Sequence, residues 1–286
     1  MAMSKTDKTL RYKLSLFVNN VSKSLFKDEF YLRKKVKPLL MVALKFKYAK
    51  GFPVKIGGKV ECLLDPTFYF ANWENFGGGH NSGFEECVNE ASQSKVFFDV
   101  GGHIGLYSIP IAKLQNDNGV VHTFEPASHN YKMLKKHVAL NSLKNVSLNN
   151  VLVGAEANDN VAFKEDSTGI NPMNSLADVD KTEGNDIISK KMIKLDEYCK
   201  ENQIYPNVMK IDVEGAEVQV LKGAMEVIKK SSPTIYLSLH PKHIVSLGDS
   251  MSDITDILNE VGYKCTTIDG RDNSDFHDKE ALLTLI

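Results

Sequence analysis

The sequence lacks the features that mark secreted and membrane-spanning proteins. It holds only four cysteines in 286 residues, and these show neither the pairwise spacing of a metal site nor the density of a disulfide scaffold. No apolar run approaches the length of a membrane span, and the N-terminus is too polar for a signal peptide. We therefore expect a cytoplasmic protein in a reducing compartment.

A strong net charge is also absent, although charge is distributed unevenly along the chain. The formal net charge is -1, yet residues 1–50 hold 13 Lys and Arg against 3 Asp and Glu, which leaves 22 against 33 in the rest. An acidic body repels a polyanion, so a nucleic-acid partner is disfavoured.

The basic N-terminal segment has a helical pattern. Between Leu10 and Phe26 apolar residues recur at spacings of three and four, with Lys and Asn between them, and a second helical stretch extends to about Tyr48. One interpretation is an accessory helical layer packed on the body, and another is a peripheral helix on an anionic membrane surface. The remaining length suits one α/β core, so we expect a helical extension over residues 1–50 and one main domain over 51–286.

The main domain is organised around residues 95–125. A short apolar run, Val96 to Val100, predicts a buried parallel strand, and glycines follow it at once. Helical spacing resumes at Leu106, and a second apolar strand, Val120 to Phe124, ends in the acid Glu125. This strand, glycine turn, helix and strand unit is typical of a site for an adenosine-type ligand.

The dinucleotide fingerprint Gly-x-Gly-x-x-Gly is absent from this turn, which reads Asp99-Val-Gly-Gly-His-Ile-Gly105. A carboxylate two residues before the first glycine would repel a pyrophosphate but suits the ammonium group of an amino-acid tail. S-adenosylmethionine has such a tail and NAD does not. Glu125 is placed to accept both hydroxyls of a ribose. The pattern favours a methyl-donor site over a nucleotide site.

A second stretch of chemical interest runs from Asn207 to Gly223. Val208 to Ile211 predicts a buried strand, and we expect a helix from Glu214 to Lys222. Glu214 and Glu217 then have a structural explanation, because acids in a first helical turn are favoured by the helix dipole. Asp212 has none, and it would lie in the same crevice as the glycine turn. A strand over 233–239 brings His240 to the same edge. For a histidine at the carboxyl end of a parallel strand beside a ligand crevice, a catalytic role is favoured over a structural one.

The other expected elements complete an alternating α/β pattern. They are a hairpin at 52–64, helices at 84–91, from Pro126 to about Asn141 and at 254–261, and strands at 146–153, 160–164, 263–268 and 281–285, of which the last two could pair antiparallel.

Two polar or aromatic loops are candidates for contact with the acceptor, the first as a lid or a wall of the acceptor site and the second through residues that face the substrate. The alternative for each is a surface loop. The first carries Trp73, Phe76, Gly77 to Gly79 and His80, and the second carries Thr168, Asn171, Asn174 and Ser175.

These motifs resemble the FkbM family of S-adenosylmethionine-dependent O-methyltransferases. The similarity rests on residues 98–105, on Phe124-Glu125-Pro126, on Asn141 and above all on Lys210-Ile-Asp-Val-Glu-Gly-Ala-Glu217 with Gly223 beyond. The departures are His103, where the family usually has asparagine, and Ser238, where many members have glutamate. The second departure weakens the assignment of a base or a metal at that edge.

The resemblance implies a Rossmann-like methyltransferase fold, with a seven-stranded, mostly parallel sheet whose last strand is antiparallel. It also implies donor-binding residues: Asp99, Gly101, Gly102, His103 and Gly105 for the methionine part, Glu125 with Pro126 for the ribose, Asn150, Val151 and Leu152 for the adenine, and in addition Asn141 and Asp212.

The expected chemistry is methyl transfer to a hydroxyl of a carbohydrate, glycan or similar small molecule. Such a hydroxyl has a high pKa, so a base is needed, and we expect His240 in this role with Asp212 and Glu214 orienting it or the acceptor. Alternatively, Asp212 and Glu214 hold a divalent cation such as Mg²⁺ that acidifies the hydroxyl. Two further hypotheses are a NAD-linked oxidoreductase and a non-catalytic adenosyl-ligand binding module.

Overall fold

The computed structural model describes residues 41–286 except 70, 79–80, 117, 166–174 and 177–185. The amphipathic helix expected between Leu10 and Phe26 lies outside these residues. Residues 41–47, within the second helical stretch, are helical. No helix of the described part is long and apolar enough to cross a bilayer. The chain forms two compact units, Met1–Phe76 and Gly77–Ile286.

The described part of the first unit contains the expected hairpin. Strands β1 (Phe52–Ile56) and β2 (Val60–Leu64) pair antiparallel. Gly57 and Gly58 form the turn with positive φ angles of 58° and 71°. Two short 3-10 helices follow, η1 (Pro66–Phe68) and η2 (Trp73–Asn75).

The second unit contains a seven-stranded sheet in the order β12-β13-β11-β10-β3-β4-β5. Its strands are β3 (Val96–Val100), β4 (Val120–Phe124), β5 (Val146–Asn149), β10 (Val208–Ile211), β11 (Thr234–Ser238), β12 (Tyr263–Thr267) and β13 (Glu280–Leu285). Strand β13 runs antiparallel to both of its neighbours, whereas the pairs from β11 to β5 are parallel. The expected sheet with a reversed last strand is confirmed.

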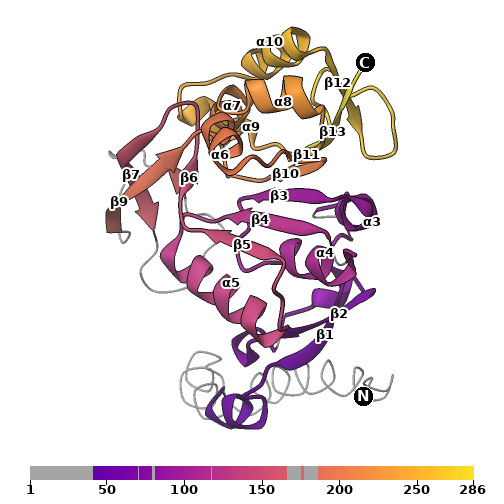
Figure 1. Cartoon of the computed structure of the whole chain (residues 1–286), viewed down its shortest axis with the longest axis vertical. Helices are drawn as coiled ribbons and strands as arrows, with labels where there is room; N and C mark the ends of the chain where they lie inside the picture. The colour runs from indigo at the N-terminus through magenta and orange to yellow at the C-terminus, as the bar shows by residue number, and fades with distance from the viewer. Residues whose placement is uncertain (1–40, 70, 79–80, 117, 166–174, 177–185) are drawn as a thin grey trace, which may run out of the picture. The chain divides into compact units, whose positions relative to one another are not determined.

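Helices cover both faces of this sheet (Figure 1). They are α3 (Phe84–Gln93), α4 (Ser108–Leu114), α5 (Ser128–Leu140), α6 (Leu195–Asn202), α7 (Glu217–Lys222), α8 (Met225–Ser231), α9 (Pro241–Ser246) and α10 (Met251–Val261). The side chains of β3 alternate between the two faces. Phe98 and Val100 join a core cluster with Val218 and Leu221 of α7, whereas the Asp99 side chain contacts Ser108 of α4.

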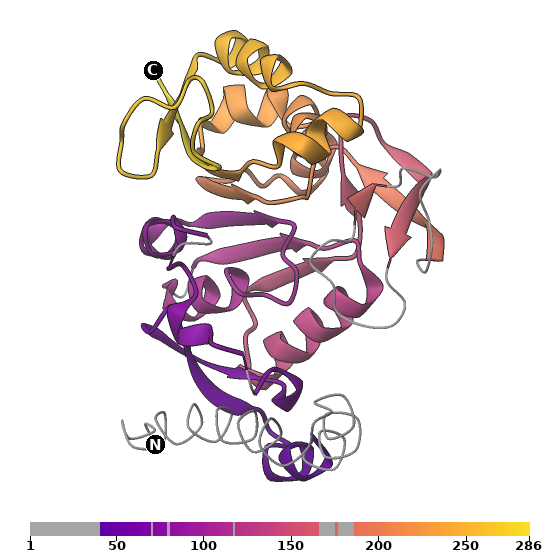
Figure 2. The ribbon, with the colours of Figure 1, turned by 180° about the vertical axis from the view of Figure 1, so that it is seen from behind.

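A second, four-stranded sheet was not expected in full from the sequence. It has the order β6-β9-β7-β8, with β6 (Leu152–Val153), β7 (Asn158–Glu165), β8 (Ser175–Leu176) and β9 (Asp186–Ile193). Figures 1 and 2 show it beyond the carboxyl ends of β4 and β5. The single strand expected over residues 146–153 is therefore wrong. It divides at Asn150, whose side chain turns back to donate to the carbonyl oxygens of Glu125 (2.8 Å) and Pro126 (3.0 Å).

Several helix starts also differ from the expectation. Helix α10 begins at Met251 rather than at Ile254, because Ser250 and Asp253 form a capping box before it. The helix after β4 begins at Ser128 rather than at Pro126, because Ala127 has an extended backbone and donates its N–H to the Glu125 carboxylate. The helix after β10 begins at Glu217 rather than at Glu214, since Glu214 and Gly215 both have positive φ angles, 53° and 111°. The dipole argument therefore applies to Glu217 and not to Glu214.

Candidate functional site

The site lies where the order of the strands reverses. From β3 the chain proceeds to β4 and β5 on one side, and it later returns to β10 on the other side of β3. The carboxyl ends of β3 and β10 therefore separate into loops that run in opposite directions, which is where open α/β sheets bind ligands. The N–H of Asp212 donates to the carbonyl of Val100, the last residue of β3, so the two loops start side by side.

Gly101 fits between these loops because it has no side chain. A Cβ atom added there would lie 1.8 Å from the carbonyl oxygen of Asp212, and the φ angle of 87° also favours glycine. The N–H groups of Gly101 and Gly102 both donate to the carbonyl of Phe124. The glycine turn thus joins the ends of β3, β4 and β10.

The Asp99 carboxylate is buried and hydrogen-bonded to Ser108. It is 2% exposed and accepts hydrogen bonds from the hydroxyl and the backbone N–H of Ser108. The Ser108 hydroxyl is also 2.6 Å from that of Thr123. Burial raises the pKa of Asp99, while the Ser108 hydroxyl bond and the charge of Lys210 oppose that rise. Its expected contact with a ligand ammonium group stays a prediction.

Glu125 holds the glycine turn by its carboxylate. Oε2 accepts the N–H of His103 at 2.7 Å, and Oε1 accepts the N–H of Ala127 at 2.9 Å and the Asn130 amide at 3.3 Å. Burial raises the pKa of Glu125 to about 7, although these three hydrogen bonds act in the opposite direction. The expected ribose contact also stays a prediction.

His103 occupies a left-handed backbone position in the turn, with φ 49°. Asparagine and histidine adopt this conformation more readily than most residues, which explains how His103 can stand where the family usually has asparagine. Its Nε2 atom is buried and has no hydrogen-bond partner within the described residues. Burial lowers the pKa of His103 to about 4, against the attraction of Asp212.

On the other side of the crevice, Asp212 is paired with a buried lysine. Lys210 Nζ lies 2.9 Å from Asp212 Oδ2 and 4.7 Å from the centre of the Tyr107 ring. Burial alone would raise the pKa of Asp212, but the charge and hydrogen bond of Lys210, with smaller effects of His240 and His103, bring it below its ordinary value. Asp212 is therefore ionised at neutral pH.

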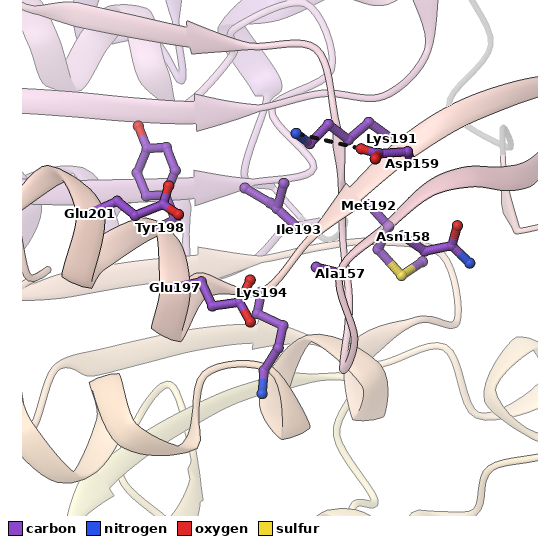
Figure 3. Close-up of a pocket in the computed structure, with 10 residues that line it drawn as sticks. All are labelled: Ala157, Asn158, Asp159, Lys191, Met192, Ile193, Lys194, Glu197, Tyr198 and Glu201. Carbon is purple, nitrogen blue, oxygen red and sulfur yellow. Dashed lines mark ion pairs between the residues drawn. The ribbon is translucent and has the colours of Figure 1, made fainter.

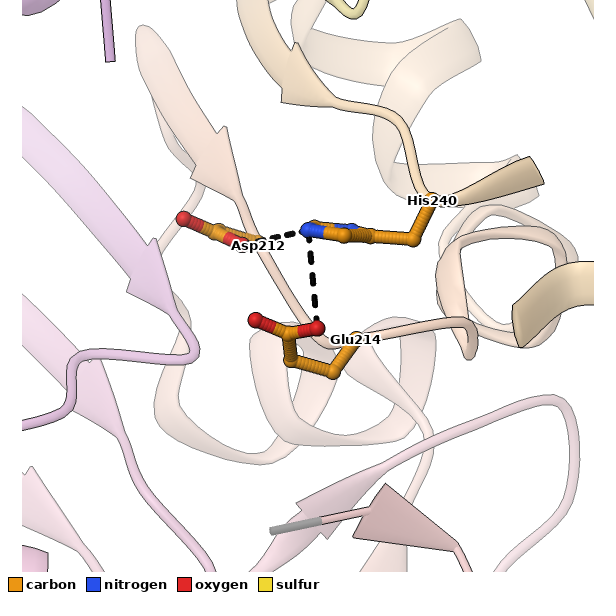
Figure 4. Close-up of side chains that lie close together, drawn as sticks. All are labelled: Asp212, Glu214 and His240. Atoms are coloured by element: carbon orange, nitrogen blue, oxygen red, sulfur yellow. Dashed lines mark ion pairs between the residues drawn. The ribbon is translucent and has the colours of Figure 1, made fainter. Parts of the chain in front are cut away.

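Figure 4 shows how His240 faces two carboxylates. Its Nε2 atom is 3.8 Å from Asp212 Oδ1 and 3.6 Å from Glu214 Oε2. One carboxylate oxygen of Asp212, one of Glu214 and one ring nitrogen of His240 lie within 4.8 Å of one another. Within the described residues, this is the one group of at least three His, Cys, Asp or Glu side chains close enough together to hold a metal ion. The three candidate catalytic residues expected from the sequence are thus brought together.

Glu217 also belongs to this cluster, and sequence reasoning gave it only a structural role. Its side chain is 0% exposed, and Oε1 lies 2.8 Å from His240 Nδ1. The available signal was its position in the same acidic run as Asp212 and Glu214. Which atom of which side chain it meets depends on the folded positions of β11 and α9.

The carboxylates outweigh burial in setting the charge of His240. Burial lowers the pKa of its imidazole, but the hydrogen bond to Glu217 and the charges of Glu217, Glu214 and Asp212 together raise it above its ordinary value. Burial raises the pKa of Glu214, and His240 and His243 act against that rise. His243 stacks on His240 with ring centres 5.8 Å apart, and its Nδ1 is 3.3 Å from Glu214 Oε2.

Several residues expected to bind the donor have other contacts. Asn141 caps the end of α5, where its amide donates to the His137 carbonyl. It thus lies toward the amino ends of the parallel strands, whereas Glu125 lies at their carboxyl ends. The Asn150 amide nitrogen donates to the carbonyls of Glu125 and Pro126, which follow β4, and its amide oxygen accepts from Lys190 Nζ at 3.2 Å. Leu152 is buried in β6 against Ala127 and Phe163.

The two loops expected to face an acceptor are only partly described. Trp73 donates its indole N–H to the Phe68 carbonyl within the first unit. Gly79, His80, Thr168, Asn171 and Asn174 lie outside the described residues, while Ser175 begins β8.

A surface hollow also lies away from the crevice, between β7, β9 and the start of α6 (Figure 3). Lys191, Lys194, Glu197 and Tyr198 are among the residues that line it. None of the expected site residues takes part in it, so it is separate from the cluster at the strand ends.

The comparison with protein families matches residues 99–265, more than half of the chain, to the methyltransferase FkbM domain. The chain belongs to the FkbM methyltransferase family. The matched range of this FkbM domain begins at Asp99 and contains the glycine turn, Glu125 and the Asp212–His240 cluster.

A curated relative is the hexuronic acid methyltransferase AglP of Haloferax volcanii. It is 27% identical over 164 residues, which are 56% of this chain and 64% of the relative. The match thus spans somewhat less than two thirds of the length of that protein.

Solved structures are similar at low sequence identity. The methyltransferase FkbM of Methylobacillus flagellatus is 15% identical with a TM-score of 0.41, and covers 77% of this chain and 54% of its own. A SAM-dependent methyltransferase of Aquifex aeolicus is 14% identical with a TM-score of 0.37, and covers 70% and 87%. The family assignment rests on the family match and not on these structures.

Proposed function

We propose that this FkbM methyltransferase transfers the methyl group of S-adenosylmethionine to a hydroxyl of a carbohydrate or similar small molecule. The observation that carries the proposal is the meeting of the glycine turn with the Asp212, Glu214 and His240 cluster at one switch point. The turn would bind the donor, and the cluster would take up the proton of the acceptor hydroxyl.

The reaction is an in-line displacement at carbon. The acceptor oxygen forms a bond to the methyl carbon while the carbon–sulfur bond breaks, and the sulfonium becomes a neutral thioether. The main task of the protein is to hold the acceptor on the far side of the methyl group. The hydroxyl proton must leave as the new bond forms, and we assign it to Nε2 of His240. Asp212, Glu214 and Glu217 would stabilise the imidazolium that results.

A carbohydrate acceptor is supported by the chemistry of the site and by the similarity to AglP, a hexuronic acid methyltransferase. A sugar hydroxyl is a weak acid and needs a base within hydrogen-bond reach. A half-buried imidazole among carboxylates meets that need, since its side chain remains 21% exposed.

A divalent cation is the second way to activate the hydroxyl. The donor set of two carboxylates and one imidazole fits such an ion, and Asp212, Glu214 and His240 would hold it. A bound cation would acidify a coordinated hydroxyl. Lys210 competes with it at Asp212, since the ammonium group already pairs with one carboxylate oxygen.

Calorimetry with S-adenosylmethionine, S-adenosylhomocysteine and NAD tests the donor. We expect binding of the first two and not of NAD, and Glu125→Ala should weaken donor binding strongly. Unchanged affinity in that variant would contradict the donor site, and binding without turnover on any acceptor would indicate a non-catalytic module.

A panel of glycans and uronic acids, with His240→Ala and a chelator, tests the chemistry. With His240 as the base, the variant should lose about 10² to 10⁴ in turnover while donor affinity stays the same. If a chelator abolishes the activity of the wild type, a bound cation and not His240 as a free base activates the hydroxyl, and the base assignment is wrong.

A further inference from the structure

Glu217 is a buried acid that the proposed reaction does not use directly. Its side chain is 0% exposed, and its Oε2 atom has no hydrogen-bond partner within the described residues. Burying a carboxylate without full pairing costs free energy, and such groups are rare away from functional sites. A requirement beyond stability would explain why this acid is here.

The contacts of Oε1 show what that requirement is. This oxygen lies 3.1 Å from the backbone N of Gly215, which donates to it, and 2.8 Å from His240 Nδ1. Oε1 already accepts the Gly215 N–H, so the geometry favours the same accepting role toward His240, with the proton of the neutral ring on Nδ1. The lone pair of Nε2 then points toward Asp212 and Glu214, the direction in which Figure 4 shows that atom.

The other charged groups near the ring do not provide this control. Asp212 and Glu214 lie 3.8 and 3.6 Å from Nε2, beyond hydrogen-bond distance, and His243 stacks on the ring face with planes 7° apart. Among the described neighbours only Glu217 makes a hydrogen bond of normal length to a ring nitrogen of His240. The Gly215 N–H in turn fixes the carboxylate oxygen.

We propose that Glu217 is a positioning residue that fixes the tautomer and the orientation of His240, so that Nε2 is presented to the acceptor hydroxyl. This proposal rests on the function proposed above, because it assigns Nε2 as the atom that takes the proton. A buried acid that orients a histidine in this way is a general device of acid–base sites.

The tautomer of His240 can be measured without any turnover. Long-range ¹H–¹⁵N spectra of the full chain, recorded at a pH where the ring is neutral, should show the proton on Nδ1. In Glu217→Leu, which keeps most of the volume and removes the acceptor, the proton should move to Nε2 in most molecules. A wild-type ring with the proton on Nε2, or a tautomer unchanged in Glu217→Leu, would overturn the proposal.

Glu217→Gln separates the hydrogen bond from the charge. The Gly215 N–H should select the orientation in which the amide oxygen takes the place of Oε1, so the Nδ1 proton should remain where it is. Glu226→Gln is the matched control, since Glu226 is an exposed acid in the first turn of the next helix, α8. It should change neither the tautomer nor the rate.

Turnover gives the second readout. Glu217→Leu should lower kcat by about 10 to 100-fold, as expected for the loss of an orienting partner, with the donor dissociation constant unchanged. In a His240→Ala background the same substitution should change kcat by less than about twofold, because its effect passes through His240. An equal loss in both backgrounds would mean that Glu217 only supports the fold.

The two experiments distinguish the two proposals. If the wild type methylates no acceptor, the proposed function fails while the spectra still decide the tautomer. The wild-type spectrum requires no variant, so a Glu217→Leu protein that does not fold leaves the central measurement in place.

Discussion

The two loops that meet at the switch point use their acids in opposite ways. Around the glycine turn, Asp99 of β3 and Glu125 after β4 accept hydrogen bonds from Ser108, His103 and Ala127, and their carboxylates hold the backbone there. In the loop after β10, Asp212 and Glu214 face an imidazole nitrogen at 3.6 to 3.8 Å without a hydrogen bond to it. The first pair of acids fixes the backbone conformation by hydrogen bonds, whereas the second pair directs charged oxygens toward Nε2 of His240.

This difference explains why carboxylates at the two places have different chemical roles. A buried carboxylate with satisfied backbone donors is a fixed part of the scaffold. Carboxylates grouped around an imidazole can respond to a proton or a ligand, because their interactions change with its charge. The following predictions test this division.

The largest effect should come from Gly101→Ala, because the new Cβ would lie 1.8 Å from the Asp212 carbonyl oxygen and would push the two loops apart. We expect a loss of unfolding free energy on the order of 3 kcal/mol or more, measured by urea denaturation, and loss of donor binding. Gly248→Ala is the control, since Gly248 has a similar φ of 89° but nothing within 4 Å of an added Cβ. Equal losses in the two variants would mean that the close approach at Gly101 is unimportant.

Lys210→Met should have the next largest effect, because it leaves Asp212 without its ammonium partner. Removing one member of a fully buried ion pair costs about 3–5 kcal/mol. The Asp212 side chain is 26% exposed, so we expect a smaller loss of about 2 kcal/mol in urea denaturation. The pKa of Asp212 should rise, as followed by NMR. The double variant Lys210→Met with Asp212→Asn should recover part of the loss, and no recovery would mean that Lys210 acts through other contacts.

Glu125→Gln should change the pH dependence of stability. The folded pKa of Glu125 is raised to about 7 from an ordinary value of 4.5, so the folded state binds the proton more tightly than the unfolded state. Its contribution is complete below about pH 4.5 and is lost as the pH rises through about 7. Urea midpoints of both proteins at pH 5 and pH 8 measure it. The wild type should lose more stability between these pH values than the variant, and parallel curves would contradict the raised pKa.

The smallest effect should come from Asn141→Ala, which removes the cap at the end of α5, toward the amino ends of the parallel strands. We expect a loss of about 1 kcal/mol or less in unfolding free energy, with unchanged donor affinity in calorimetry. Weaker donor binding in a variant that is otherwise stable would place Asn141 in the donor site after all.

The sequence predicted the scaffold better than the contacts within it. The apolar runs at 96–100, 120–124 and 208–211 were each too short for a helix, and each is a buried strand as expected. The pairing of β13 with β12 also followed from their proximity along the chain. The turn after β5 was missed, because it depends on the side chain of Asn150 bonding to the distant carbonyls of Glu125 and Pro126.

For the site, the sequence by itself determined which residues reach the carboxyl edge of the sheet. Strands that end next to Asp99, Asp212 and His240 must place these residues at this edge, whatever the rest of the fold does. Only the tertiary structure decided that Asp99 is enclosed by Ser108, and that Glu217, rather than Asp212 or Glu214, makes the hydrogen bond to His240. The physical reason is that a periodic pattern specifies the direction of a strand, whereas the partner of a side chain depends on atoms that segments far apart in the sequence bring within 3 Å of one another.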